Sequence, residues 1–180
     1  MIQRAFYRAF LHAMAELEAQ ITHIPKPHAD QFKWRKRELH HMGVLFDNEI
    51  SIGEGFYLMK RGGLVLGNRC AFGCHVQIYN HAPITIGNNF LGASNLILNS
   101  GLHEAVTLQP EARAINIGDR VWTGLRVTIL GGVNIGSDVV IGAGSLVNRD
   151  IPSGSVAAGV PAKVIRKIER ADTSVWSCFD

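Results

Sequence analysis

The feature that most constrains this chain is a six-residue repeat in its C-terminal half. Written in sixes from Ile117, the sequence is IGDRVW, TGLRVT, ILGGVN, IGSDVV, IGAGSL and VNRDIP, with glycine second in four of the six hexads. A period of six matches neither an α-helix nor a simple alternating strand. It suits a coil of three flat faces, in which each hexad is one short strand and one corner. The aliphatic residue points into a narrow interior, and a small residue beside it lets the backbone turn. The repeat therefore predicts a β-solenoid.

The spacing of the repeats locates an insertion. Matching IG or LG positions, or their equivalents, are Ile52, Leu66, Ile86, Ile117, Ile135 and Ser153. The successive intervals are fourteen, twenty, thirty-one, eighteen and eighteen. Eighteen is three hexads and one full coil, so the interval of thirty-one is one coil plus thirteen extra positions. The excess falls in NSGLHEAVTLQPEARA, which has no period of its own, and we expect a protruding loop at about 99–115.

The segments on either side of the repeats predict helix. In MIQRAFYRAFLHAMAELEAQ, apolar residues recur at three- and four-residue steps, and the prolines of ITHIPKPHAD interrupt the pattern. After the last hexad, AKVIRKIERA is amphipathic. We expect an N-terminal helical segment over 1–45, a β-helix over 46–158, and a C-terminal helix and tail over 159–180.

Composition narrows the class of protein. A chain of 180 residues suits one substantial domain, and its net charge of +3 comes largely from KWRKR and KVIRKIER, which predicts no nucleic-acid partner. Three cysteines without CxxC spacing disfavour a disulfide framework and fit a reducing cytosol. The N-terminus has charges every few positions, so we expect no signal peptide and no membrane span. These features predict a cytoplasmic protein.

Taken together, the hexads, the His-bearing insertion, VWTG and AAGVPAKVI resemble the hexapeptide-repeat acyltransferases, and in particular the galactoside and maltose O-acetyltransferases. The likeness covers roughly 50–170. It implies a mainly β fold, a left-handed parallel β-helix, with acetyl-CoA as co-substrate and no metal. It also implies a homotrimer with acetyl-CoA in the groove between neighbours, and closed cyclic symmetry makes that assembly physically reasonable.

The resemblance implies a general base at the start of the inserted loop, which in register is His103. A hydroxyl is a poor nucleophile at neutral pH, and an imidazole titrates close to that pH, so it can remove the proton during attack on a thioester. Glu104 is a candidate to orient or charge-balance the imidazole, although neighbours on an extended segment tend to point opposite ways. A backbone N–H near the groove is the expected oxyanion donor.

The cofactor side of the family also matches by position. The resemblance places an apolar or small group along the pantetheine arm, and an amide and cations near the nucleotide, as phosphates require. The first group is Trp122, Gly124, Leu125 and Ala143, and the second is Asn148, Arg149, Lys163 and Arg166.

The acceptor side departs from the family. Where galactoside-type enzymes have an Asn and an Asp, this chain has Gly73 and His81, and Met59 replaces a Ser. These departures disfavour a simple galactoside or maltose acceptor and favour a sugar of a surface polysaccharide or its precursor. The candidates to line the acceptor pocket are Trp34, His75, Asn80 and His81.

Several alternatives stay open at this point. An amine acceptor, on an amino sugar or an antibiotic, uses the same fold. A metal hydratase of the γ-carbonic-anhydrase kind needs three zinc-binding histidines, two of them five residues apart; His75, His81 and His103 are present, but Asn80 and Leu108 leave that pair missing. A non-catalytic scaffold would not need the small and cationic positions of the cofactor side.

Overall fold

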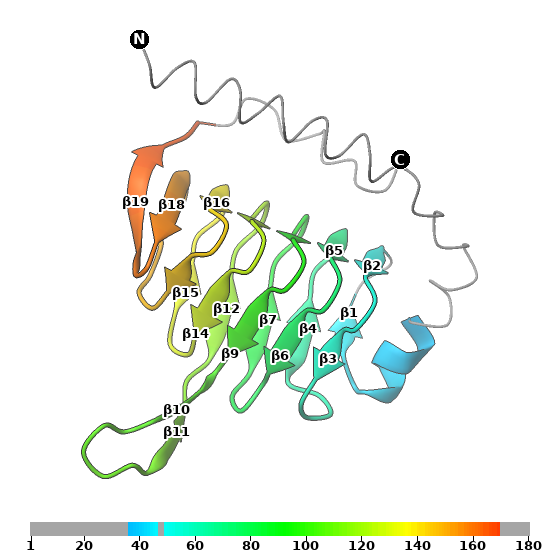
Figure 1. Cartoon of the computed structure of the whole chain (residues 1–180). Coiled ribbons are helices and arrows are strands. Elements are labelled where there is room, and N and C mark those ends of the chain that lie inside the picture. Colours follow the sequence, from blue (N-terminus) through cyan, green and yellow to red (C-terminus); the bar gives the residue numbers. More distant parts are fainter. Residues whose placement is uncertain (1–35, 47–48, 170–180) are drawn as a thin grey trace. The chain divides into compact units, whose positions relative to one another are not determined.

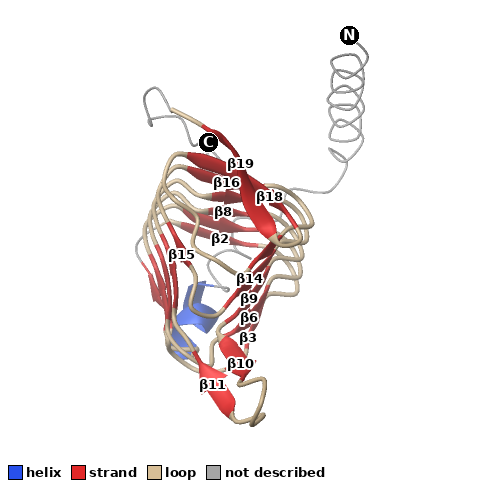
Figure 2. Cartoon of the chain, turned by 90° about the vertical axis from the view of Figure 1, so that its left-hand side faces the viewer, coloured by secondary structure: helices blue, strands red, loops and turns tan. Residues whose placement is uncertain are grey.

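The computed structural model describes residues 36–46 and 49–169, all within the compact unit Lys33–Asp180. These residues form a parallel β-helix of triangular cross-section, wound left-handed, so the predicted fold is confirmed (Figures 1 and 2). A short helical segment, residues 36–41, precedes the first coil. The helix predicted from the first residues, and Trp34, lie outside the described ranges.

Three parallel sheets form the three sides. Sheet A contains, in order, β1 (Leu45–Phe46), β4 (Leu64–Leu66), β7 (Ile84–Ile86), β12 (Ile115–Ile117) and β15 (Asn134–Ile135). Sheet B contains β2 (Ile50–Ile52), β5 (Cys70–Phe72), β8 (Leu91–Gly92), β13 (Trp122–Thr123), β16 (Val139–Ile141), β18 (Ser155–Gly159) and β19 (Ala162–Lys167). Sheet C contains β3 (Tyr57–Leu58), β6 (Gln77–Tyr79), β9 (Ile97–Asn99), β14 (Thr128–Leu130) and β17 (Leu146–Val147). Two further strands, β10 (Gly101–His103) and β11 (Pro110–Ala112), pair only with each other.

The interior is a column of stacked aliphatic side chains. In β7 the residues on either side of Thr85 are fully buried, while Thr85 itself is exposed, and the same alternation recurs in β4 and β12. Each coil places its inward residue directly on that of the coil before, as Ile84 pairs with Leu64 and Ile115 with Ile84. β-Branched residues suit this pleated, one-sided surface. Burying each such side chain stabilises the coil by about 1.5–3 kcal/mol.

The glycine of each IG pair is needed for stacking rather than for turning. A Cβ on Gly67, Gly87 or Gly118 would lie 2.7–2.8 Å from the carbonyl carbon of the glycine in the next coil. These glycines do not have positive φ; the left-handed residues stand two places later, at Arg69, Asn89 and Arg120. The expectation that glycine lets the backbone turn is therefore wrong for these positions, because the close approach of neighbouring coils is what excludes a side chain.

The coils differ in length at one corner only. In every coil, equivalent positions of sheets A and B are six residues apart in the sequence, and so are those of sheets B and C. Thr85, Leu91 and Ile97 are one such set. The number of residues between sheet C and the following strand of sheet A varies from coil to coil. Ile97 pairs with Gln77, twenty residues earlier, and with Thr128, thirty-one residues later, so these two coils differ in length. The next step of sheet C, from Thr128, is back to eighteen. We call this variable edge the C–A corner. The insertion predicted at about 99–115 lies at this corner.

Two intervals counted in the sequence do not correspond to coils. Ile52 pairs with Phe72 in sheet B, whereas Leu66 belongs to sheet A, so the interval of fourteen joins two different sides. At the other end Ile135 bridges to Ile151, which makes the last step sixteen and not eighteen.

The predicted C-terminal helix is wrong over its described part. Residues 162–167 form strand β19, which folds back antiparallel on β18 and extends sheet B. Gly159, with φ +106, and Pro161 make the reversal, and the free edge of β18 then offers backbone partners to Val164 and its neighbours. A sheet edge in reach overrides a weak helical pattern. Within the described ranges, no helix has the length and hydropathy to cross a membrane.

Adding one methyl group at a stacking glycine should destabilise the fold. We expect Gly118→Ala to lower the free energy of unfolding by about 1–3 kcal/mol, because its Cβ would meet the backbone of the next coil. The matched control is Gly144→Asn, at a position with φ +70 and no heavy atom within 4 Å of where a Cβ would lie. Asn tolerates this conformation better than other residues, so its effect should be smaller. Denaturant unfolding of both variants checks the prediction, and equal losses would contradict it.

Candidate active site

The inserted residues form a β-hairpin that projects from the C–A corner (Figure 2). Its register pairs Gly101 with Ala112, Leu102 with Glu111 and His103 with Pro110. The base is closed by the Arg113 N–H, which donates to the Ser100 carbonyl at 2.9 Å. The insertion thus satisfies its own backbone hydrogen bonds and leaves the coils above and below in register.

His103 stands at the end of β10, exposed, with its imidazole held at one nitrogen. Its Nδ1 lies 2.9 Å from the Leu108 carbonyl oxygen across the hairpin loop. A carbonyl can only accept, so the hydrogen-bonded Nδ1 carries the proton and the neutral ring has its lone pair on Nε2. Leu108 has φ +56, which is the conformation that turns the loop back toward the histidine. The loop therefore selects the tautomer in which Nε2 is unprotonated.

Glu104 shapes this loop and does not bond the imidazole. Its Oε2 accepts hydrogen bonds from the backbone N–H of Thr107 at 2.6 Å and of Val106 at 2.9 Å. These bonds, that from Thr107 first, hold the pKa of the Glu104 carboxyl below its usual value. The Glu104 carbonyl also accepts from the Leu108 N–H at 2.9 Å. The carboxylate thus fixes the turn that carries the Leu108 carbonyl, a partner of His103 that leaves no signal in the sequence.

Asn80 is committed to the backbone of the coil below. The side chain is 4% exposed, its Oδ1 accepts from the Lys60 N–H at 2.9 Å, and its Nδ2 donates to the carbonyls of Lys60 and Gly62. Ser100 holds the corresponding place one coil later, bonding the backbone of Tyr79 and Ala82. The amide of Asn80 is therefore used in fixing the corner, and its predicted place in the acceptor pocket stays a prediction.

The two other candidate histidines lie at different corners. His81 is exposed at the C–A corner, and its ring fills the space that a side chain on Gly101 would need. His75 is at the corner between sheets B and C, in the left-handed region with φ +56, where its N–H donates to the Glu54 carbonyl. Of the two, only His81 lies beside the base of the His103 hairpin in the same chain.

The predicted cofactor residues divide between two regions. Trp122 is 43% exposed on the outer face of sheet B, and Leu125 is 49% exposed at the corner that follows. Gly124 and Ala143 stack there in consecutive coils, and a Cβ on Gly124 would lie 2.6 Å from the Ala143 nitrogen, so coil stacking alone requires that glycine.

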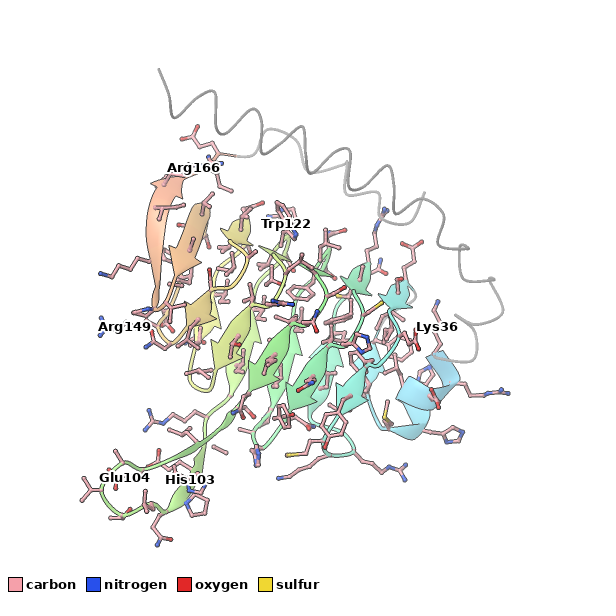
Figure 3. All side chains as sticks on the ribbon, in the orientation of Figure 1. Lys36, His103, Glu104, Trp122, Arg149 and Arg166 are labelled. Atoms are coloured by element: carbon pink, nitrogen blue, oxygen red, sulfur yellow. The ribbon has the colours of Figure 1, made fainter. Side chains whose placement is uncertain are left out.

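The remaining cofactor candidates are near the C-terminal end of the described residues. Asn148 and Arg149 follow β17, and Lys163 and Arg166 are exposed on β19, a strand and not the predicted helix. Figure 3 shows Trp122 on the side of the β-helix away from the hairpin that carries His103. A single chain therefore does not bring the predicted base and the pantetheine residues together.

No group of three or more His, Cys, Asp or Glu side chains within residues 36–46 and 49–169 is arranged to hold a metal ion. The placement of His75 and His81 at separate corners is also incompatible with a shared ligand set of His75, His81 and His103 in one chain.

Comparisons with known proteins agree with the fold. No protein-family model matches the sequence. The chain is 33% identical to the protein of Escherichia coli K12 provisionally named lipopolysaccharide biosynthesis O-acetyl transferase WbbJ, over 72% of this chain and 77% of that one. A galactoside acetyltransferase solved with coenzyme A superposes with a TM-score of 0.70 at 31% identity, covering 81% of this chain and 74% of that one. A hexapeptide-repeat acetyltransferase of Vibrio cholerae solved with acetyl-CoA gives 0.71 at 26%, covering 81% of each chain.

The fold together with these relatives places the chain in the class of acyltransferases that use an acyl thioester. The chain belongs to the hexapeptide-repeat acetyltransferases, with acetyl-CoA as its co-substrate.

The hydrogen bonds of Glu104 can be tested without any assay of activity. In Glu104→Ala we expect the Val106 and Thr107 amides to exchange with solvent severalfold faster, and the imidazole of His103 to show a mixture of tautomers by ¹⁵N NMR, because the turn loses its acceptor. Glu111→Ala, which removes a carboxylate from the other face of the hairpin, is the control. An unchanged Nδ1–H tautomer in Glu104→Ala would show that the loop holds His103 without the carboxylate.

Proposed function

We propose that the chain transfers the acetyl group of acetyl-CoA to a hydroxyl of a sugar that belongs to a surface polysaccharide or its precursor, with His103 as the general base. The observation that carries the proposal is the hydrogen bond of His103 Nδ1 to the Leu108 carbonyl. It leaves an exposed Nε2 lone pair on a hairpin that the β-helix supports, which is what deprotonation of an acceptor hydroxyl requires.

The proposed reaction needs one proton shuttle. Nε2 of His103 takes the hydroxyl proton as the acceptor oxygen attacks the thioester carbonyl, and the imidazolium is stabilised by its Nδ1–H bond to Leu108. The carbon–sulfur bond then breaks, the acetyl ester forms, and the leaving sulfur takes the proton back from Nε2. A positioned base of this kind contributes about 10²–10⁴-fold to the rate.

The acceptor class rests on the relatives and on the departures from them. WbbJ is named for lipopolysaccharide biosynthesis, and the solved relative at 31% identity is a galactoside acetyltransferase, so a carbohydrate hydroxyl is the common element. This chain has Gly73 and His81 where the resemblance expects polar acceptor contacts, and the His81 ring lies against Gly101 at the hairpin base. His81, and not Asn80 or His75, is therefore our candidate for contact with the acceptor.

The proposal includes a homotrimer with three shared sites. Trp122 and Leu125 present large apolar surface to solvent, and Trp122 faces away from the hairpin of its own chain (Figure 3). A second subunit that laid its hairpin beside this surface would complete the site. A cytoplasmic location is part of the same proposal, because the described cysteines, Cys70 and Cys74, are free thiols.

Replacing the base tests the core of the proposal. We expect His103→Ala to lower kcat for acetyl transfer by about 10²–10⁴-fold. Binding of CoA, measured by calorimetry, should stay within a few-fold of the original. A panel of sugars and amino sugars with acetyl-CoA, read by release of the CoA thiol, gives the rates. Full turnover by His103→Ala would overturn the base assignment, and turnover of amines alone would overturn the O-acetyltransferase assignment.

Mixing two inactive variants tests the shared site. His103→Ala and Trp122→Ala are each expected to be inactive, and subunit exchange between them should restore activity to about a quarter of the original, since one interface in four would pair an intact base with an intact cofactor surface. Light scattering of each variant checks that the trimer forms. Absence of any recovery in trimers shown to be mixed would place both residues in a site within one chain.

A further inference from the structure

The C–A corner carries a row of basic side chains that leads to His103. Each of the first two steps of sheet C is a shift of twenty in the register, so Arg61, His81 and Gly101 occupy the same place in three successive coils. Neighbouring coils are about 5 Å apart. The three positions therefore form a straight line along the axis of the β-helix, ending at the base of the hairpin.

The row continues onto the face of the hairpin that carries His103. Residues two apart on a strand point to the same side, so His103 projects on the side where the missing Gly101 side chain would lie. His81 occupies that space, with its Cγ 2.7 Å and its Nε2 2.9 Å from the position of a Cβ on Gly101. The His81 ring, which lies over Gly101, and the His103 side chain are thus on one face of the hairpin, and positions 101 and 103 are about 7 Å apart along the strand.

The backbone beneath this row is rigid. Asn80 clamps the turn that carries Arg61 through three hydrogen bonds to Lys60 and Gly62. Ser100 clamps the turn that carries His81 through the backbone of Tyr79 and Ala82. The corner holds its exposed side chains in fixed order, which is what a binding site needs.

Acidic groups are turned away from this face. The hairpin residues that share the side of His103 are Gly101, Pro110 and Ala112, whereas Glu111 is on the opposite side, paired with Arg113 at 2.9 Å. The Glu104 carboxylate is engaged by the turn amides of Val106 and Thr107. Arg61 is exposed and forms no ion pair with any described residue. Arg61 therefore gives this face a formal positive charge that no acidic side chain among the described residues pairs with.

We propose that the acceptor carries a carboxylate or phosphate group, which Arg61 and His81 bind so that a hydroxyl of the same molecule reaches Nε2 of His103. Arg61 offers a planar fork of donors suited to either anion, and His81 adds a second donor one coil closer to the base. The distance from Arg61 to His103 along the row, about 10–15 Å, is the length of a sugar residue with a charged substituent or of a short oligosaccharide. This inference rests on the proposed function and specifies its substrate class.

The first experiment compares acceptors that differ only at one carbon. Methyl glucoside, methyl glucuronide and methyl glucoside 6-phosphate, and the same series on galactose, are titrated into the full chain while the side-chain imidazole resonances are followed by NMR. We expect the His81 resonances to shift with the uronates or the sugar phosphates, and not with the neutral glycosides. A response to uronates alone identifies an acidic sugar, and a response to phosphates alone identifies a phosphorylated or nucleotide-linked sugar. Equal shifts with neutral glycosides, or no shift with either anion, would overturn the proposal.

The second experiment assigns the effect to Arg61. In Arg61→Ala the KM for the anionic acceptor should rise about tenfold with kcat nearly unchanged, and Arg61→Lys should recover part of the loss. Arg113→Ala removes the same charge from the other face of the hairpin base and should leave KM unchanged. An unchanged KM in Arg61→Ala would overturn the assignment. If transfer requires His103 but ignores acceptor charge, only this inference fails; if transfer proceeds without His103, the proposed function fails.

Discussion

The close approach of each coil to the next is the interaction on which this structure depends. Glycines such as Gly87 and Gly118 let the backbones of neighbouring coils pack without an intervening side chain, and the parallel ladders of all three sheets run unbroken as a result. The interior column of isoleucine, leucine and valine is a consequence of that stacking, because each inward residue lies on its counterpart one coil away. In such a quasi-one-dimensional fold every contact is between neighbours, so a local error in register would propagate to the whole side.

This constraint explains why the chain varies in length at one corner only. The steps from sheet A to B and from B to C are six residues in every coil, whereas the return from C to A takes up the difference between coils of sixteen, eighteen, twenty and thirty-one. An insertion is tolerated in a stacked fold only when its backbone groups find partners without disturbing the coils. The β10–β11 hairpin does this by pairing with itself. The position of the functional loop is thus dictated by where the β-helix tolerates extra residues.

The repeat and the insertion were predicted from the sequence because each leaves a one-dimensional signal. Hexads can be counted, and thirteen surplus positions mark the insertion that contains His103. Contacts that form only when the chain folds back on itself left no such signal. Leu108 contacts His103 through its backbone oxygen, so any residue that can adopt the same left-handed conformation could take its place. The C-terminal strand was missed for a related reason, since Val164 and Ile165 are compatible with helix until the free edge of β18 is available. The structural role of Asn80 could not be predicted either, because its position alone does not reveal that its amide bonds Lys60 and Gly62.

In the proposed function, two different parts of the chain provide specificity and chemistry: the C–A corner would bind the acceptor, and the hairpin would carry the base. The proposed base, His103, depends on local geometry within the loop, where Glu104 fixes the turn and Leu108 fixes the ring. The proposed acceptor contacts, Arg61 and His81, stand on turns of the coils themselves, which Asn80 and Ser100 fix by hydrogen bonds from the following coil. A substitution at either of these exposed positions would alter the charge presented to the acceptor and leave both the stacking and the tautomer of His103 unchanged. Under the proposed function, the fold therefore lets substitutions at the corner change which acceptor is recognised while the reaction on the hairpin stays the same.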